Sequence, residues 1–209
     1  MYSVTHVWQG WIDLAGRGRR SFYDWRDGMS PIGRLCLMFA AAAGIGLCSR
    51  VAIPLPFTPV PLSLQTFGVA AAAVTMGRGW GGASVATYAA CIALGAPWTV
   101  SGLGGLAVFA GPTAGYLLGF VLEGAALNLF AANPARCRWF PMWGAIFVCD
   151  AVFVLTPGTL WLWGWLESAG QPVTLMDAAA KGFFPFIFAD IVKSGLTAAI
   201  VGWLGRQGH

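Results

Sequence analysis

Two oppositely charged residues, Asp190 and Lys193, stand three positions apart in a strongly apolar segment near the carboxyl end of the chain. Residues i and i+3 of an α-helix share one face, so the spacing predicts an ion pair. Such a pair could bind the polar groups of a small molecule, since a carboxylate accepts hydrogen bonds and an ammonium group donates them. The alternative is a self-neutralising pair that only holds a helical bundle together.

A second polar group follows a proline-rich segment. Four prolines occur within eight residues, at Pro54, Pro56, Pro59 and Pro61. Proline fixes φ and removes a backbone donor, so this segment cannot form a helix. Three residues that can both donate and accept hydrogen bonds come next in the chain: Ser63, Gln65 and Thr66. The pattern predicts a stiff loop that covers a polar binding site.

The composition predicts an all-α integral membrane protein. Hydrophobic residues make up 57% of the 209 residues, charged residues 10%, and the mean hydropathy is +0.69. Soluble domains carry about 25% charged residues. Irregular backbone at the edge of a bilayer must be buried in protein or line a cavity, which supports the binding-site interpretation of the proline segment. Charges inside a span are costly and mark functional sites, which favours the same interpretation of Asp190 and Lys193.

The apolar segments predict a bundle of six transmembrane helices in one membrane domain, residues 34–205. The expected helices are Leu35–Ile53, Leu64–Met76, Gly81–Ala96, Thr113–Ala132, Met142–Leu166 and Pro185–Leu204. The second and third are short for a bilayer core of about 30 Å. With the last helix starting at Pro185, Asp190 lies about 8 Å inside it at 1.5 Å per residue.

The basic residues indicate the orientation. With the amino terminus in the cytoplasm, nine arginines lie inside: Arg17, Arg19, Arg20, Arg26, Arg34, Arg78, Arg136, Arg138 and Arg206. Arg50 and Lys181 then lie outside, which agrees with the positive-inside rule. Both termini are expected to be cytoplasmic and the proline loop to face outward. Residues 1–33 form a cytoplasmic extension that could be an amphipathic surface helix, dock on a partner or lack fixed structure; residues 206–209 form a tail.

Three motifs carry a resemblance to a known family. They are Pro59-Val-Pro-Leu-Ser-Leu-Gln-Thr66, Gly111-Pro-Thr-Ala-Gly-Tyr-Leu-Leu-Gly-Phe120 and Pro185-Phe-Ile-Phe-Ala-Asp-Ile-Val-Lys193. In their order and spacing, they resemble the BioY family, the biotin-binding S-components of energy-coupling-factor (ECF) vitamin transporters. The resemblance covers roughly residues 34–204. It implies a bacterial plasma-membrane protein that captures biotin from outside, with a transmembrane coupling protein and cytoplasmic ATPases as partners.

The resemblance also assigns ligand-binding residues. Biotin has a ureido ring with two N–H donors and a carbonyl, an apolar thioether ring and a charged valerate. Asp190 is suited to accept from the ureido ring, and Lys193 to fix Asp190 while donating to the ligand. Which end of biotin meets this pair stays open. The other expected contacts are Ser63, Gln65, Thr66, Thr113 and Tyr116, although Tyr116 could instead belong to an interfacial aromatic belt.

Two loops are expected to close over the ligand. The first contains Pro59, Val60 and Pro61, and the second contains Gly104, Gly105, Gly111 and Pro112, where glycine lets backbone approach a ligand. Trp98 stands where the family more often has a smaller residue, so we expect a reshaped wall of the pocket. The tryptophans of Leu160-Trp-Leu-Trp-Gly-Trp165 could stack on a ligand or form an interfacial belt.

Small residues crowd the first expected helix. Ala40 with Gly44, and Ala42 with Gly46, form small-xxx-small pairs that permit close helix contact. We expect this face to dock the coupling protein.

The chain contains no GxxxxGK[ST] motif, and its two histidines, His6 and His209, stand near the termini. We therefore expect neither an enzyme nor a metal site or cofactor. A different class remains open: a self-sufficient, proton-coupled vitamin transporter that uses Glu123, Asp150 or Asp190 as relay groups.

Overall fold

The computed structural model describes residues 25–77, 79–131 and 139–205, and these are mostly helical. The elements are α2 (Pro31–Arg50), β1 (Ala52–Ile53), β2 (Leu62–Ser63), α3 (Gln65–Thr75), α4 (Trp80–Ala93), η1 (Leu106–Ala110), α5 (Ala114–Ala131), α6 (Trp139–Cys149), η3 (Asp150–Leu155), α7 (Thr156–Ser168), α8 (Leu175–Gly182) and α9 (Phe184–Gly205). The extension predicted at residues 1–33 lies outside this part up to residue 24, as does the tail at 206–209.

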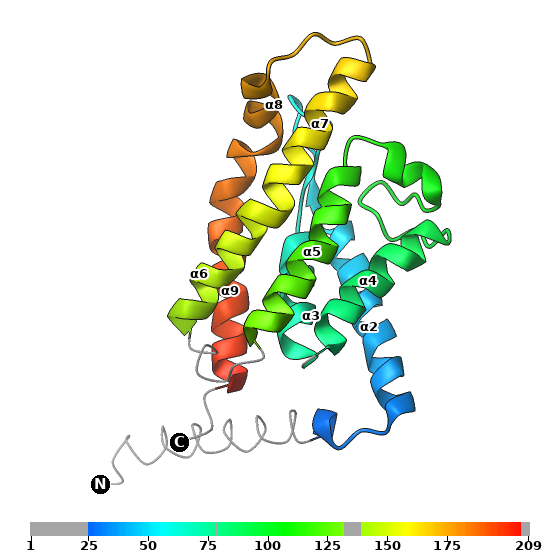
Figure 1. The fold of residues 1–209 in the computed structure, drawn as a ribbon, viewed down its shortest axis with the longest axis vertical. Helices are drawn as coiled ribbons and strands as arrows, with labels where there is room; N and C mark the ends of the chain where they lie inside the picture. Colours follow the sequence, from blue (N-terminus) through cyan, green and yellow to red (C-terminus); the bar gives the residue numbers. More distant parts are fainter. Residues whose placement is uncertain (1–24, 78, 132–138, 206–209) are drawn as a thin grey trace, which may run out of the picture.

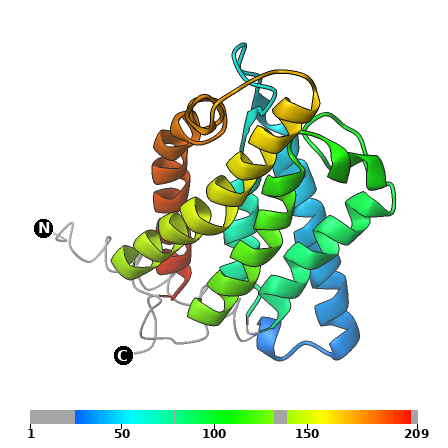
Figure 2. The same ribbon diagram turned by 45° about the horizontal axis from the view of Figure 1, so that its top comes forward.

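The helices pack around α5, which contacts α3, α4, α6, η3 and α7 (Figure 1). Figure 2 shows α2 and α4 on one side of α5 and the α8–α9 pair on the other. Glycines on α5 permit this crowding. A Cβ on Gly119 would collide with the backbone of η3 at Phe153, and a Cβ on Gly124 would lie 2.8 Å from Val85 on α4.

In the part of the chain that the structure describes, four helical segments are long and apolar enough to cross a membrane: Pro31–Arg50, Ala114–Ala131, Trp139–Ser168 and Leu175–Val201. A mostly helical structure with several apolar candidate spans is therefore confirmed, which is the coarser part of the prediction. The other two expected spans are helical but short. At 1.5 Å per residue, α3 and α4 measure about 17 and 21 Å, less than a bilayer core of about 30 Å.

The first helix begins and ends earlier in the chain than the predicted Leu35–Ile53. It begins at Pro31, where Ser30 caps the backbone N–H of Gly33, and it ends at Arg50 rather than at Ile53. Ile53 precedes Pro54, and a residue before proline is driven out of the helical region. Ala52 and Ile53 instead pair with Ser63 and Leu62 in a two-residue antiparallel ladder. The fold is thus not purely helical, since this ladder closes the base of the proline loop.

Three further elements were not predicted. The glycine-rich loop contains the 3₁₀ helix η1, and the segment expected as one long helix is interrupted by the π-helical turn η3. A short helix, α8, precedes α9. Its sequence signal is Thr174-Leu-Met-Asp177, a capping box in which Thr174 and Asp177 satisfy each other's backbone N–H groups.

The four small residues of α2 that were expected to dock the coupling protein differ in burial. Ala42 and Gly46 are buried, and a Cβ on Gly46 would lie 2.7 Å from the Trp98 ring. Ala40 is exposed, and a Cβ on Gly44 would meet nothing within 4 Å. Ala42 and Gly46 therefore cannot form a docking surface for another protein, and only Ala40 and Gly44 remain available.

Candidate ligand-binding site

A cavity of about 680 Å³ lies at the end of the bundle where α3 and α9 begin. The proline loop, the glycine-rich loop and the first turns of α5 complete its walls. All seven residues predicted to bind ligand line it: Ser63, Gln65, Thr66, Thr113, Tyr116, Asp190 and Lys193. Six of the seven predicted loop residues also line it: Pro59, Val60, Pro61, Gly104, Gly111 and Pro112. Gly105 does not line it.

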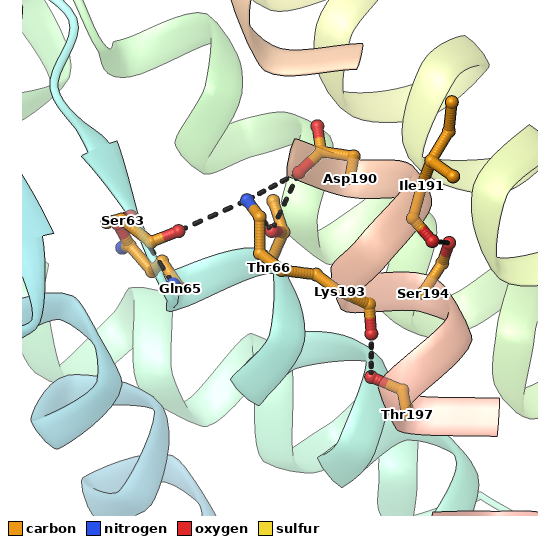
Figure 3. Close-up of polar contacts among 8 residues, drawn as sticks. All are labelled: Ser63, Gln65, Thr66, Asp190, Ile191, Lys193, Ser194 and Thr197. Carbon is orange, nitrogen blue, oxygen red and sulfur yellow. Dashed lines mark hydrogen bonds and ion pairs between the residues drawn. The ribbon is translucent and has the colours of Figure 1, made fainter. Parts of the chain in front are cut away.

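Asp190 and Lys193 form the predicted ion pair, with the Lys193 Nζ 2.5 Å from the Asp190 Oδ1. Nζ also donates to the Thr66 hydroxyl at 2.8 Å and to the Ser63 carbonyl oxygen at 3.2 Å (Figure 3). These three partners use all three N–H donors of the ammonium group. Lys193 is thus fixed by the protein itself and holds the start of α3 against α9.

The second oxygen of Asp190 is different. Thr66 donates to Oδ1 at 3.3 Å, whereas Oδ2 is buried and has no hydrogen-bond partner among the described residues. The Asp190 side chain is only 2% exposed. A buried acceptor without a partner is costly.

Gln65 is held by residues that the sequence analysis did not assign. Its Nε2 donates to the Tyr88 hydroxyl, which in turn donates to the Trp98 carbonyl oxygen at 2.9 Å. The Tyr88 and Trp98 rings stack with an interplanar angle of 4°. Trp98 does not line the cavity, so the expectation that it reshapes the wall was wrong; it contacts Tyr88, the residue that holds Gln65.

Tyr116 is buried, which excludes the interfacial-belt interpretation. Its hydroxyl donates to the Gly182 carbonyl oxygen at 2.8 Å, so the ring rather than the hydroxyl is offered to the cavity. The ring fits because its neighbours are glycines: a Cβ on Gly158 would strike the ring, and a Cβ on Gly182 would strike the hydroxyl.

The tryptophans of α7 do not line the cavity. Trp161 donates from its indole N–H to the Gly111 carbonyl oxygen at 2.9 Å, and Trp163 donates to the Val173 carbonyl oxygen at 3.0 Å. They therefore tie the end of α7 to two neighbouring loops, one of which carries a predicted binding residue.

A much smaller cavity, about 10 Å³, lies beside the ion pair. Glu123 from α5 and Asp150 from η3 line it together with Asp190 and Lys193. Glu123 is 0% exposed and Asp150 is 3% exposed. Both oxygens of Glu123 and one of Asp150 have no hydrogen-bond partner in the part of the chain that the structure describes. Three carboxyl groups thus surround one lysine.

No group of three or more His, Cys, Asp or Glu side chains within residues 25–77, 79–131 and 139–205 is arranged to hold a metal ion. The chemistry that these residues support is the binding of a small, partly polar molecule. The cavity volume lies within the range of about 300–1,000 Å³ typical of small-molecule sites.

Comparison with known proteins supports this interpretation. The model of the BioY family matches residues 23–207, a longer stretch than the motifs indicated. The biotin transporter BioY of Thermotoga maritima is 32% identical over 152 residues, 71% of this chain and 82% of that protein. The probable biotin transporter BioY of Bacillus subtilis is 40% identical over 144 residues, 69% of this chain and 74% of that protein.

A solved structure is also similar to the chain. The crystal structure of the S-component for biotin from an ECF-type ABC transporter superposes with a TM-score of 0.75 and 27% sequence identity. The match covers 87% of this chain and 96% of that one.

Proposed function

The chain belongs to the BioY family, and from this membership and the lined cavity we propose that it is the membrane S-component that captures biotin for uptake. The observation that carries the proposal is the meeting of Ser63, Thr66, Asp190 and Lys193 at the wall of a cavity of about 680 Å³. Two of the three family motifs supply these four residues, and tertiary packing unites them.

The ureido ring of biotin is the end that meets Asp190. The ion pair is electrically neutral overall, so a neutral ring adds no uncompensated charge beside it, whereas a buried carboxylate would. The ring also supplies N–H donors, which a carboxylate at the cavity wall can accept. The valerate then points toward the loops, where its charge keeps contact with water.

The loops form the lid of this site. The β1–β2 ladder anchors both ends of the proline loop, and Val60, two residues before β2, is buried against the core. The Thr58 hydroxyl accepts from the Val60 N–H at 3.2 Å and so stiffens the part of the loop that leads into β2. The lid faces outward, and both termini lie in the cytoplasm, as the distribution of arginines favours.

Replacing Pro59 and Pro61 together with glycine is expected to speed biotin release. The prolines restrict the free loop, so less entropy is lost when it closes, and glycine removes that advantage. Stopped-flow release kinetics measure the effect. Pro172→Gly is the matched control, since Pro172 is an exposed proline in a different loop and does not line the cavity. Unchanged release from the double variant would make the loop a passive connector.

An ECF transmembrane coupling protein and cytoplasmic ATPases supply the energy, in a bacterial plasma membrane. The remaining candidate contact for the coupling protein is the outer face of α2 at Ala40 and Gly44. This helix is the least enclosed of the four candidate spans, since only 22% of its apolar stretch is buried inside the protein.

Ala40→Trp is expected to preserve biotin binding and to reduce co-purification with the coupling protein, because bulk separates helices that pack through small residues. Ala199→Trp, at an exposed position of α9, is the matched control and should assemble normally. Ala42→Trp should instead lower the folded yield, since Ala42 is 0% exposed. Normal assembly of Ala40→Trp would exclude this face.

The secondary-transporter alternative is favoured by one observation, the unpartnered carboxyl groups of Glu123 and Asp150 beside Asp190. Reconstituted vesicles separate the two functions. The S-component proposal predicts biotin accumulation only with the coupling protein, the ATPases and ATP. Accumulation by the chain alone under a proton gradient, abolished in Glu123→Gln, would establish the alternative.

A further inference from the structure

A second cavity, of about 260 Å³, lies at the opposite end of the bundle from the biotin site. It forms where α2 begins, α3 ends and α4 begins, and its lining includes Arg26, Asp27, Arg34, Met38, Met76 and Trp80. The biotin cavity, by contrast, lies where α3 begins. None of the residues assigned to biotin binding lines this second cavity.

Among the described residues that line the cavity, two carry a guanidinium group and one carries a carboxylate. Arg26 binds the Asp27 Oδ1 through its Nη2 at 2.7 Å and its Nε at 2.8 Å, and its Nη1 donates to the Thr75 carbonyl oxygen at 2.8 Å. Arg34 donates from its Nη2 to the Asp27 carbonyl oxygen at 2.6 Å. The formal charges of these three side chains therefore sum to one positive unit.

Arg34 also retains an unused donor. Its Nε is buried and has no hydrogen-bond partner within the described ranges. A buried N–H without an acceptor is costly, and the guanidinium fork matches the oxygens of a phosphate group. A singly charged phosphodiester would offer acceptor oxygens to the Arg34 guanidinium group, which lines the cavity, and would balance the summed charge of the three side chains.

The surroundings indicate where the phosphodiester comes from. The cavity contains the apolar side chains of Met38, Met76 and Trp80 beside the arginines. On the adjoining outer face of α2, Ile32 is 75% exposed and Phe39 is 50% exposed, as expected for contact with lipid chains. Basic cavities at the ends of transmembrane helices are suited to anionic headgroups. We infer that this cavity binds the headgroup of an anionic phospholipid, with Arg34 as the principal phosphate contact.

Native mass spectrometry of the purified full-length chain tests this with two lipids of matched acyl chains, phosphatidylglycerol and phosphatidylcholine. We expect phosphatidylglycerol to be retained about fivefold more tightly, the effect of one basic group on an anionic lipid. Arg34→Gln should abolish the preference. Lys181→Gln, which removes one positive charge from α8 at the other end of the bundle, should keep it.

Competition with inorganic phosphate distinguishes a lipid headgroup from a free phosphate anion as the ligand of this cavity. Inorganic phosphate that displaces phosphatidylglycerol at equal concentration would assign the cavity to a free anion and overturn the lipid assignment. An equal preference in the native chain and in Arg34→Gln would also overturn it. If Arg34→Gln fails to fold, the native chain still decides, because retention of both lipids to the same extent contradicts the inference.

Discussion

Replacing Asp190 with asparagine is expected to weaken biotin binding by more than tenfold, about 1.4 kcal/mol. The amide keeps the shape of the side chain but removes the negative charge that fixes Lys193 at 2.5 Å. It also removes one of the two acceptor oxygens, so a ligand N–H and Lys193 can no longer both be satisfied. Isothermal titration calorimetry of the purified variant measures the loss.

Asp177→Asn is the matched control for this change. Asp177 lies at the start of α8 and is exposed, so the same substitution should leave biotin affinity unchanged. Because asparagine leaves Lys193 buried without a counter-ion, the folded yield of Asp190→Asn can also fall. Asp190→Asn combined with Lys193→Met removes both charges and restores a neutral site, and it should bind biotin no better than the single variant. Near-native affinity in either variant would exclude the pair from the binding site.

Thr66→Val is expected to weaken biotin binding by about tenfold through the loss of one hydroxyl. This hydroxyl accepts from Lys193 at 2.8 Å and donates to Asp190 at 3.3 Å, so it joins α3 to both charges. Valine has the same shape and cannot do either. The ammonium group then loses one of its three fixed partners, and the pair is less rigidly placed for the ligand.

Thr75→Val is the matched control, an identical change on the same helix. Thr75 lies at the opposite end of α3, where its hydroxyl donates to the Ala71 carbonyl oxygen at 2.6 Å. Comparison of the two variants by calorimetry and thermal unfolding separates a loss of binding from a loss of stability. Equal affinities would mean that the Thr66 hydroxyl only supports packing.

The seven residues proposed to bind the ligand, all of which line the cavity, could be named because they stand within the motifs that carry the resemblance to the BioY family. The ion pair follows from the helical period alone. That Lys193 meets the Ser63 carbonyl and the Thr66 hydroxyl could not be read from the sequence, since these groups come from distant segments. Tyr88 was missed for the same reason: nothing local distinguishes a tyrosine that fixes Gln65 from one that fills the core.

The small residues of α2 show another limit. Alanine and glycine occupy residues 40–44 without a break, so the sequence has no apolar–polar contrast to say which side packs inward. The structure places Ala42 inward and Ala40 outward. The predicted end of the first helix was also a few residues too late, because Ile53 precedes a proline and is driven out of the helical conformation.

Equilibrium binding to the purified chain tests the central claim most directly, with biotin, desthiobiotin and riboflavin as ligands. Desthiobiotin keeps the ureido ring and lacks the thioether ring, so it reports whether the ureido N–H groups carry recognition. The account predicts saturable one-to-one binding of biotin, weaker binding of desthiobiotin and no binding of riboflavin. Riboflavin binding as tight as that of biotin, or no binding of biotin by correctly folded protein, would contradict it.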